Sequence, residues 1–297
     1  MELGNKKYSV VGLGEILWDI LPDDKKLGGA PANFAYHAHC LGAQGYIVSS
    51  VGNDSLGDEI LESVDKLDLN RDFVFIDNAH PTGTVSVELD NTGTPNYIIH
   101  KDAAWDFITS GNELLNFAPK VDAVCFGSLC QRSQTSRDTV RKFLSSTNDS
   151  CLRIFDINIR QDYYSKDIIE AMLEFANVFK LNDEELPLVA DLLSMTGSEE
   201  QILQELMKRF SLQLIVLTKG GQGSVLFGND KRSQLEVSDI KIADTVGAGD
   251  SFTAAVAMGL LQNKPLEQIH AHANRLASFV CTQNGATPTV PGDCRYE

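Results

Sequence analysis

The sequence predicts an α/β fold in which most strands of a central sheet run parallel. Apolar runs of strand length alternate with amphipathic stretches of helix length along most of the chain, which is the pattern of repeated βαβ units. The 297 residues, 43% of them hydrophobic and 22% charged, suit one large domain, residues 1–297. Because no repeat or low-complexity linker divides the chain, two equal domains are not expected.

Strands are expected where short apolar runs are bounded by turn-forming residues, at residues 8–13, 46–51, 121–126, 152–157, 178–181 and 212–217. Helices are expected where apolar residues recur with helical spacing, at residues 33–41, 57–66, 134–145, 166–174, 198–210, 249–262 and 266–283. A further strand-like run at 240–243 precedes the helix at 249–262. A helix between successive strands allows those strands to lie parallel.

One stretch, residues 84–100, interrupts the alternation. Two β-rich runs, TVSVELD and NYIIH, flank the turn-rich sequence NTGTP, which predicts a β-hairpin. In the first run polar residues alternate with valine and leucine, so one face is polar and the other needs cover. The pattern leaves two interpretations open: a lid over a site, or an antiparallel edge of the main sheet.

The charge of the chain limits the partners it can have. Lys and Arg number 25 against 41 Asp and Glu, so the net charge is −16, and no basic cluster interrupts this balance. Nucleic acid is therefore not an expected partner. An anionic small molecule can bind only where a helix N-terminus, a divalent metal or a placed arginine overcomes the negative field.

The sequence also indicates a cytoplasmic protein without a membrane segment. The N-terminal residues MELGNKKYSVVGLGE lead directly into a strand and lack the pattern of a signal peptide. The longest apolar-rich stretch, residues 254–261, is far too short to span a bilayer. The six cysteines show neither zinc-site spacing nor a disulfide framework, so reduced thiols are expected.

The segment DTVGAGDSFT, residues 244–253, carries the strongest chemical signal. Gly247, Ala248 and Gly249 can form a tight turn whose backbone N–H groups point outward at the start of a helix. Together with the helix dipole they would form an anion hole for a transferring phosphoryl group. Asp250 follows in the first helical turn, where its carboxylate could accept the proton of an attacking hydroxyl. Taken alone, this aspartate could equally be a helix cap.

A second motif, GGAPAN at residues 28–33, makes the interpretation specific. The two motifs together, in this order and spacing, resemble the paired signatures of the ribokinase-like, or PfkB-type, carbohydrate kinases over essentially the whole chain. The resemblance implies a three-layer α/β/α fold with a mainly parallel central sheet and a small β-lid, formed by insertions around residues 16–30 and 83–106. It also implies an ATP-dependent sugar kinase with Asp250 as the general base.

The resemblance assigns roles to individual residues. In the family the first motif binds the sugar and the second transfers the phosphoryl group. The implied sugar contacts are Asp19, Gly28, Gly29 and Asn33, and the implied phosphoryl-transfer residues are Gly247, Ala248, Gly249 and Asp250. Arg160 closes the segment DINIR at a strand end, where open α/β sheets place their ligands, and by resemblance it neutralises phosphoryl charge. A surface salt bridge is its alternative.

Nucleotide and metal contacts follow by the same resemblance. NDEE at residues 182–185 is similar to the N-x-x-E element, in which Glu185 would organise Mg²⁺, commonly through water, although helix capping is the plainer explanation. The implied nucleotide contacts are Asn182, Thr218, Gly220, Gly223 and Asn274. A monovalent-cation site, for K⁺, is implied at Asp244, Val246, Gln283, Gly285 and Thr289.

The choice of substrate depends on smaller features. Ribokinases typically carry a lysine in the first motif where this chain has Ala30 and Pro31, and GGAPAN, GEILWD, PTGTVSVE and AAWD resemble fructokinases. Fructose is therefore the expected substrate. A sugar-phosphate kinase remains open because Lys25, Lys26 and Lys101 could supply positive charge, and so do 2-keto-3-deoxygluconate, ribose and nucleoside kinases.

Two other functional classes do not fit the sequence as well. A nicotinamide dehydrogenase is disfavoured because the first strand is followed by G-x-G without the third glycine. A non-catalytic sugar sensor is disfavoured because Asp250 and the anion-hole residues are intact. Pairing of two lids across a two-fold axis would cover their unpaired face, so a homodimer through the lid is a further expectation.

Overall fold

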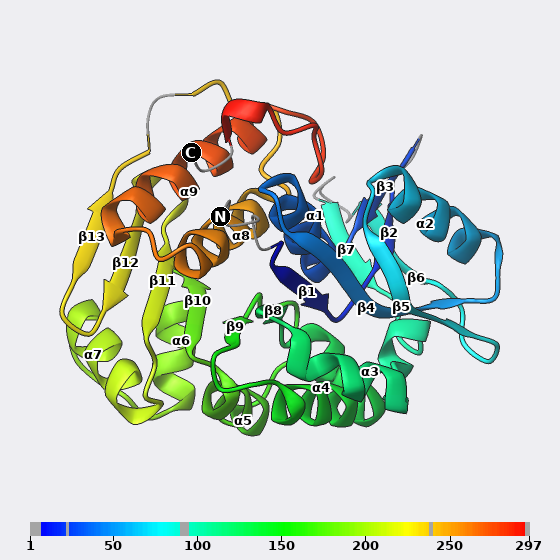
Figure 1. The fold of residues 1–297 in the computed structure, drawn as a ribbon, viewed down its shortest axis with the longest axis horizontal. Helices are drawn as coiled ribbons and strands as arrows, with labels where there is room; N and C mark the ends of the chain where they lie inside the picture. Colours follow the sequence, from blue (N-terminus) through cyan, green and yellow to red (C-terminus); the bar gives the residue numbers. More distant parts are fainter. Residues whose placement is uncertain (1–6, 22–23, 90–94, 238–239, 295–297) are drawn as a thin grey trace, which may run out of the picture.

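The computed structural model describes residues 7–21, 24–89, 95–237 and 240–294. Within these residues a nine-stranded sheet has the order β13-β12-β11-β10-β9-β8-β1-β4-β5 (Figure 1). Its strands are β1 (Ser9–Leu13), β4 (Gln44–Gly52), β5 (Asn70–Asp77), β8 (Ala123–Phe126), β9 (Leu152–Asp156), β10 (Val178–Asn182), β11 (Leu214–Thr218), β12 (Ser224–Gly228) and β13 (Arg232–Leu235). The strands from β5 to β11 pair in parallel, whereas β12 and β13 are antiparallel. The predicted α/β class is confirmed.

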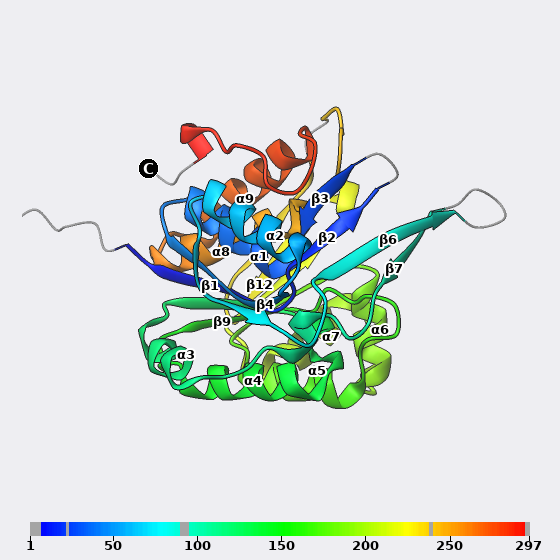
Figure 2. The ribbon, with the colours of Figure 1, turned by 90° about the vertical axis from the view of Figure 1, so that its right-hand side faces the viewer.

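Helices cover both faces of this sheet, as Figure 2 shows. One layer contains α1 (Ala30–Cys40), α2 (Ser55–Lys66), α8 (Ala248–Leu261) and α9 (Leu266–Cys281). The other contains α3 (Asn112–Phe117), α4 (Gln134–Ser146), α5 (Lys166–Phe175), α6 (Glu185–Leu192) and α7 (Glu199–Arg209). In the part of the chain that the structure describes, no helix combines the length and apolar character that crossing a bilayer requires.

Apolar cores lie on both faces of the sheet, between it and these layers, and the strands divide their side chains between the two faces. Val11 belongs to the core under α3 to α7, while its neighbour Val10 belongs to the core under α8 and α9. Val124 and Cys125 of β8 divide in the same way. Successive side chains of a strand point to opposite faces, so continuous apolar strands are what a sheet covered on both sides requires.

The predicted hairpin is confirmed, and it is not an edge of the main sheet. Strands β6 (Gly83–Leu89) and β7 (Pro95–Ile99) are antiparallel and join β2 (Leu17–Ile20) and β3 (Lys25–Gly28) in a separate four-stranded sheet of order β3-β2-β6-β7. We call it the small sheet. Figure 2 shows it projecting from one side of the layered body. The predicted turn at residues 90–94 lies outside the described residues.

The strand-like run at 240–243 is not a strand, and this expectation was wrong. Residues 241–243 are exposed, and no strand among the described residues pairs with them. Instead, the backbone N–H groups of Ala243 and Asp244 donate to the carbonyl oxygen of Cys281, the last residue of α9. The run therefore crosses the end of a helix, and its apolar residues are available to face ligand.

Candidate active site

A cavity of about 700 Å³ lies where the parallel strands end at their carboxyl side. Residues that follow β1, β9, β10 and β11 line it, together with the small sheet and the start of α8. Of the residues that the sequence analysis assigns to the site, those that line the cavity are Asp19, Gly28, Gly29, Asn33, Arg160, Asn182, Thr218, Gly220, Gly223, Val246, Gly247, Ala248, Gly249, Asp250 and Asn274. The lining does not include Glu185, Asp244, Gln283, Gly285 and Thr289. Ligand sites of open α/β sheets occur at this edge.

The small sheet and α1 form the end of the cavity assigned to the sugar. Gly28 allows the Asp19 carboxylate to approach, since a Cβ at Gly28 would lie 2.5 Å from Asp19 Oδ2. Nearby, the Asn33 side chain donates from Nδ2 to Asp250 Oδ2 at 2.8 Å. The Oδ1 atom of Asn33 is buried without a hydrogen-bond partner among the described residues. A buried oxygen of this kind is ready to accept a hydrogen bond from a ligand hydroxyl.

Residues 247–249, which are predicted to form an anion hole, lie at the start of α8. Gly247 has φ 79° and is the N-cap of α8, a left-handed conformation that glycine adopts without strain. The first N–H groups of a helix have no partner within the helix, and they carry the positive end of its dipole. Gly247, Ala248 and Gly249 all line the cavity, and the Ala248 N–H donates to the backbone oxygen of Thr245 at 3.3 Å. The N–H groups of Gly247 and Gly249 are the donors left to face an anion there.

The surroundings of Asp250 raise the pKa of its carboxyl group. Burial raises the pKa of its carboxyl to about 6, and the charge of Asp156 raises it further, while the Asn33 hydrogen bond and the charges of Lys180 and Arg160 oppose this. A carboxylate with a pKa of about 6 is ionised at neutral pH and still has appreciable affinity for a proton.

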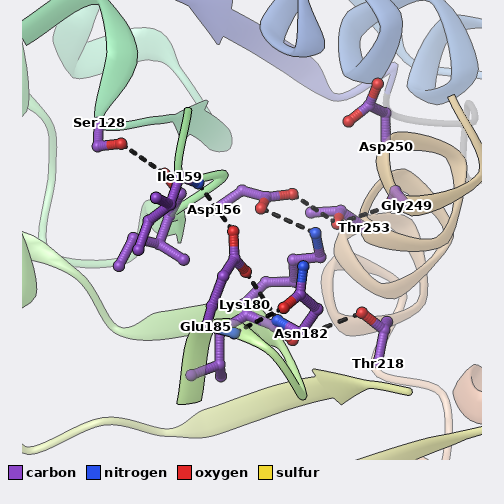
Figure 3. Close-up of polar contacts among 12 residues, drawn as sticks. Ser128, Asp156, Ile159, Lys180, Asn182, Glu185, Thr218, Gly249, Asp250 and Thr253 are labelled. Atoms are coloured by element: carbon purple, nitrogen blue, oxygen red, sulfur yellow. Dashed lines mark hydrogen bonds and ion pairs between the residues drawn. The ribbon is translucent and has the colours of Figure 1, made fainter. Parts of the chain in front are cut away.

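A buried ion pair that the sequence analysis does not predict lies beside the predicted anion hole. Lys180 Nζ lies 3.0 Å from Asp156 Oδ1, and the Thr253 hydroxyl of α8 lies 3.2 Å from Asp156 Oδ2 (Figure 3). A Cβ on Gly249 would lie 3.3 Å from Lys180 Nζ, so the ammonium group is directly beside the anion hole. Burial alone would lower the pKa of Lys180, but nearby carboxylates outweigh it and hold the pKa above its ordinary value. The lysine is therefore charged.

Arg160 lies at the cavity as predicted. Its guanidinium donates to the backbone oxygen of Ile159 at 3.0 Å, and its side chain lines the cavity. Burial raises the pKa values of the Glu15 and Asp19 carboxyl groups. The positive charge of Arg160 partly opposes this effect and lowers both values. One exposed guanidinium thus acts on carboxylates at the sugar end and on Asp250.

Asn182 and Glu185 make the local backbone contacts expected of helix capping, which is the alternative explanation given for the NDEE segment. The Asn182 side-chain oxygen accepts from the N–H groups of Glu184 and Glu185, and the Glu185 carboxylate accepts from Ile159 and Asn182, each contact within 2.9 Å (Figure 3). Glu185 thus joins the ends of β9 and β10. The described residues contain no cluster of three His, Cys, Asp or Glu side chains that could hold a metal. A Mg²⁺ ion that arrives with nucleotide phosphates needs no such cage, and Asp183 and Glu184 in the lining offer carboxylates for it.

The other end of the cavity suits a nucleotide base. Thr218, Gly220 and Gly223 line it from the loop after β11, and Asn274 lines it from α9. The apolar side chains of Val237, Ile240, Ile242 and Ala277 complete this end. Asn274 Nδ2 donates to the backbone oxygen of Glu236 at 3.0 Å, which ties α9 to the segment after β13. A flat aromatic ring bordered by polar groups fits such a lining.

Among the residues assigned to a monovalent cation, the Asp244 carboxylate accepts hydrogen bonds from its own chain. Asp244 Oδ1 accepts from Val246 N and Oδ2 from Gly285 N, each at 3.1 Å. The carbonyl oxygens of the neighbouring Ala286 and Pro288 face α1, where they contact His37 Nε2 and the Tyr36 hydroxyl. A lysine also lies beside Asp244, as described below.

Glu15 is a cavity residue that the site assignment did not include. It is 2% exposed, it lines the cavity, and its Oε2 has no hydrogen-bond partner among the described residues. Burial raises the pKa of this carboxyl to about 7. Its position, directly after the buried strand β1 in the segment GEILWD, was the available signal.

We predict that Glu15→Gln stabilises the protein at pH 8 but much less at pH 5. The folded-state pKa of about 7 lies above the ordinary value of 4.5, so the folded protein binds more protons and its stability falls as pH rises between these values. Replacing the acid by an amide removes a loss of about 2–3 kcal/mol at pH 8. Urea unfolding at both pH values measures this, with the exposed Glu62→Gln as control. Equal gains at pH 5 and pH 8 would contradict it.

Together the fold and the cavity define an α/β protein in which a helix N-terminus and the Asp250 carboxyl group line one ligand-sized cavity. Residues 23–292 match the pfkB family of carbohydrate kinases, so the chain belongs to this family. A fructokinase of Salmonella typhimurium is 26% identical, with 94% of this chain and 95% of that protein covered.

Solved structures agree with this assignment. A sugar kinase of Pyrococcus horikoshii, crystallised in complex with ATP, is 27% identical with a TM-score of 0.75 over 94% of this chain and 93% of that one. A fructokinase of Vibrio cholerae, crystallised with fructose, ADP and calcium, has a TM-score of 0.81 over 96% of both chains. At 24% identity, this second likeness concerns the fold alone.

Proposed function

We propose that the protein transfers the γ-phosphoryl group of ATP to a hydroxyl of a sugar, with fructose as the preferred substrate. The observation that carries the proposal is the position of Asp250. Its carboxylate follows the anion hole in the first turn of α8 and is hydrogen-bonded to Asn33 of the sugar motif. Base, anion hole and sugar-binding residue therefore lie at one cavity, as an in-line phosphoryl transfer requires.

In the proposed reaction, the sugar hydroxyl gives its proton to Asp250 while its oxygen forms a bond to the γ-phosphorus. The bond between that phosphorus and the oxygen bridging to the β-phosphate breaks, and ADP leaves. The N–H groups of the anion hole and the charges of Lys180 and Arg160 stabilise the negative charge of the transferring group. Mg²⁺, when bound with the nucleotide, would neutralise further phosphate charge.

The charges around the cavity support an uncharged sugar as substrate. Three carboxyl groups, those of Glu15, Asp19 and Asp250, line the cavity near Arg160. A substrate phosphate or carboxylate would be repelled by these groups unless further cations faced it. Among the described lining residues, the remaining cation is Lys180, which is paired with Asp156.

The lysines that could have served a charged substrate are engaged elsewhere. Lys25 pairs with Glu59 and lies over the Trp18 ring, Lys26 pairs with Asp244, and Lys101 lies over the ring of Tyr163. None of the three is in the cavity lining. The likeness to fructokinases supports fructose as the sugar.

An assay of ADP release with a panel of acceptors tests the proposal. We expect the highest kcat/KM with fructose, and lower values with ribose, a nucleoside, 2-keto-3-deoxygluconate and fructose 6-phosphate. A higher value for either anionic acceptor would overturn the substrate assignment. Sugar binding without ADP release from any acceptor would instead indicate a sensor.

We predict that Arg160→Ala lowers kcat about tenfold or more and changes the KM for ATP much less. A charge directed at the transferring group acts more strongly in the transition state than in the ground state. Because Arg160 lowers the pKa of Asp250, its loss should also move the acid limb of the pH profile to higher pH. Arg160→Lys, which keeps the charge, should retain more activity. An alanine variant with unchanged kcat would place Arg160 outside the reaction.

The small sheet is proposed to act as the lid. Asp19, Gly28, Val85 and Ile99 of its strands line the cavity, so closing it would remove water from the reacting groups. Tyr97 on β7 is 58% exposed, which supports the further proposal that two lids pair in a homodimer.

A further inference from the structure

A lysine of the small sheet reaches the segment that precedes the anion hole. Lys26 Nζ on β3 lies 3.5 Å from Asp244 Oδ2, across 218 residues of sequence. The stem of this lysine passes over the loop after α9, since a Cβ on Gly285 would lie 4.0 Å from Lys26 Cδ. The ammonium group therefore lies at the junction of the segments 244–247 and 285–289.

The Asp244 carboxylate is the point at which these segments and the small sheet meet. Val246 N–H donates to one carboxylate oxygen, and Gly285 N–H and Lys26 approach the other. The Asp244 carboxylate therefore has a cation beside it that its own chain supplies.

This junction lies against the anion hole. A Cβ on Gly247 would lie 2.7 Å from both Cα and the backbone oxygen of Ala286, so the two segments touch directly at the N-cap of α8. A displacement at Asp244 would therefore be passed to the N–H groups that hold the phosphoryl group. Displacements of about 1 Å at a reacting centre can reduce rates a hundredfold.

We propose that the Lys26 ammonium supplies the positive charge at this junction in place of a free monovalent cation, which makes the kinase reaction independent of K⁺. The inference rests on the proposed kinase function and adds a positioning residue to it. Lys26 also faces Asp19 across the β2–β3 pair, so the charge is carried by the same strands that carry a sugar contact. Because it is covalently attached, its local concentration does not depend on the salt in solution.

The proposal is tested by comparing KCl with tetramethylammonium chloride at equal ionic strength. For the wild-type protein we expect the same kcat in both salts. Lys26→Met should lose roughly tenfold or more of kcat in tetramethylammonium chloride and regain most of it in KCl, because K⁺ can then enter beside Asp244. Lys26→Arg should remain independent of K⁺. Lys25→Met, on the same strand but paired with Glu59, is the matched control and should behave as wild type.

Thermal unfolding without substrate gives a second measurement that does not depend on activity. KCl should raise the Tm of Lys26→Met relative to tetramethylammonium chloride by about 2 °C or more, and leave the wild-type Tm unchanged, since an ion that binds only the folded state stabilises it.

Three results would overturn the proposal. One is a wild-type protein that itself requires K⁺, which can be observed even if the methionine variant does not fold. The others are a Lys26→Met variant equally active in both salts, and a folded variant that K⁺ neither activates nor stabilises. Failure of the kinase proposal is distinguished from all of these, because it would appear as absent ADP release by the wild type in either salt.

Discussion

Asp250→Asn should lower kcat at least about a hundredfold while leaving the affinity for the sugar nearly unchanged. The amide has almost the same shape, so the contact with Asn33 at 2.8 Å can be kept after an amide flip, but it cannot accept the proton of the attacking hydroxyl. The comparison requires kcat from ADP release and the sugar Kd from calorimetry. Asp58→Asn is the matched control, because Asp58 is an exposed aspartate in the first turn of α2.

The pH dependence adds a second criterion for Asp250. A base must be ionised to act, so the wild-type kcat should fall as pH drops through the pKa of about 6. This acid limb should be absent from the residual activity of Asp250→Asn. Since Glu15 and Asp250 influence each other, the observed midpoint belongs to the coupled pair. A variant with wild-type kcat at pH 8 would mean that Asp250 only caps α8.

Lys180→Met should have the largest effect on stability, about 3–5 kcal/mol lower free energy of unfolding. The side chains of Lys180 and Asp156 are only 9% and 6% exposed, so removing the lysine leaves a buried carboxylate without its cation. The kcat should fall as well, because the ammonium lies beside the anion hole. Loss of this charge should also raise the pKa of Asp250, which Lys180 lowers, and move the acid limb to higher pH.

Chemical unfolding at pH 7 measures the predicted loss. The double variant Lys180→Met with Asp156→Asn should recover much of the stability, because the uncompensated charge is gone, but not the activity. Lys219→Met is the matched control, since Lys219 pairs with Glu199 at 2.7 Å in a more exposed position and such pairs contribute about 0–1 kcal/mol. A loss for Lys180→Met no greater than for Lys219→Met would show that the buried pair is unimportant.

Most of the main sheet was predictable because its strands are buried on both faces and therefore apolar. The edge strands were not: β5 contains Arg71 and Asp72, and β13 begins with Arg232, as expected of strands with one neighbour. The run at 240–243 was wrongly predicted as a strand because it contains apolar residues. Its apolar residues belong to a ligand-facing loop, and only tertiary contacts distinguish such a loop from a strand.

The site was predictable as far as its chemistry is local in sequence. The turn at Gly247 and the aspartate after it form one short motif, so their geometry follows from neighbouring residues. The Lys180–Asp156 pair was missed because it depends on the register between two parallel strands. The sequence of one strand does not identify which residue of the other strand lies opposite. A lysine inside the apolar strand VFKLN was nevertheless a sign that a buried anion must lie nearby.

The packing of α1 against α8 has a consequence for synthesis of the protein on the ribosome. Asn33 and Asp250 are 217 residues apart, so at usual elongation rates roughly ten to forty seconds separate their translation. Throughout this interval Val10, Phe34 and Ala38 cannot pack against Phe252 and Ala255, which complete their apolar core in the folded protein. A nascent chain would therefore be inactive and prone to association until its last helices emerge, and a ribosome that stalls between these motifs would release an aggregation-prone product.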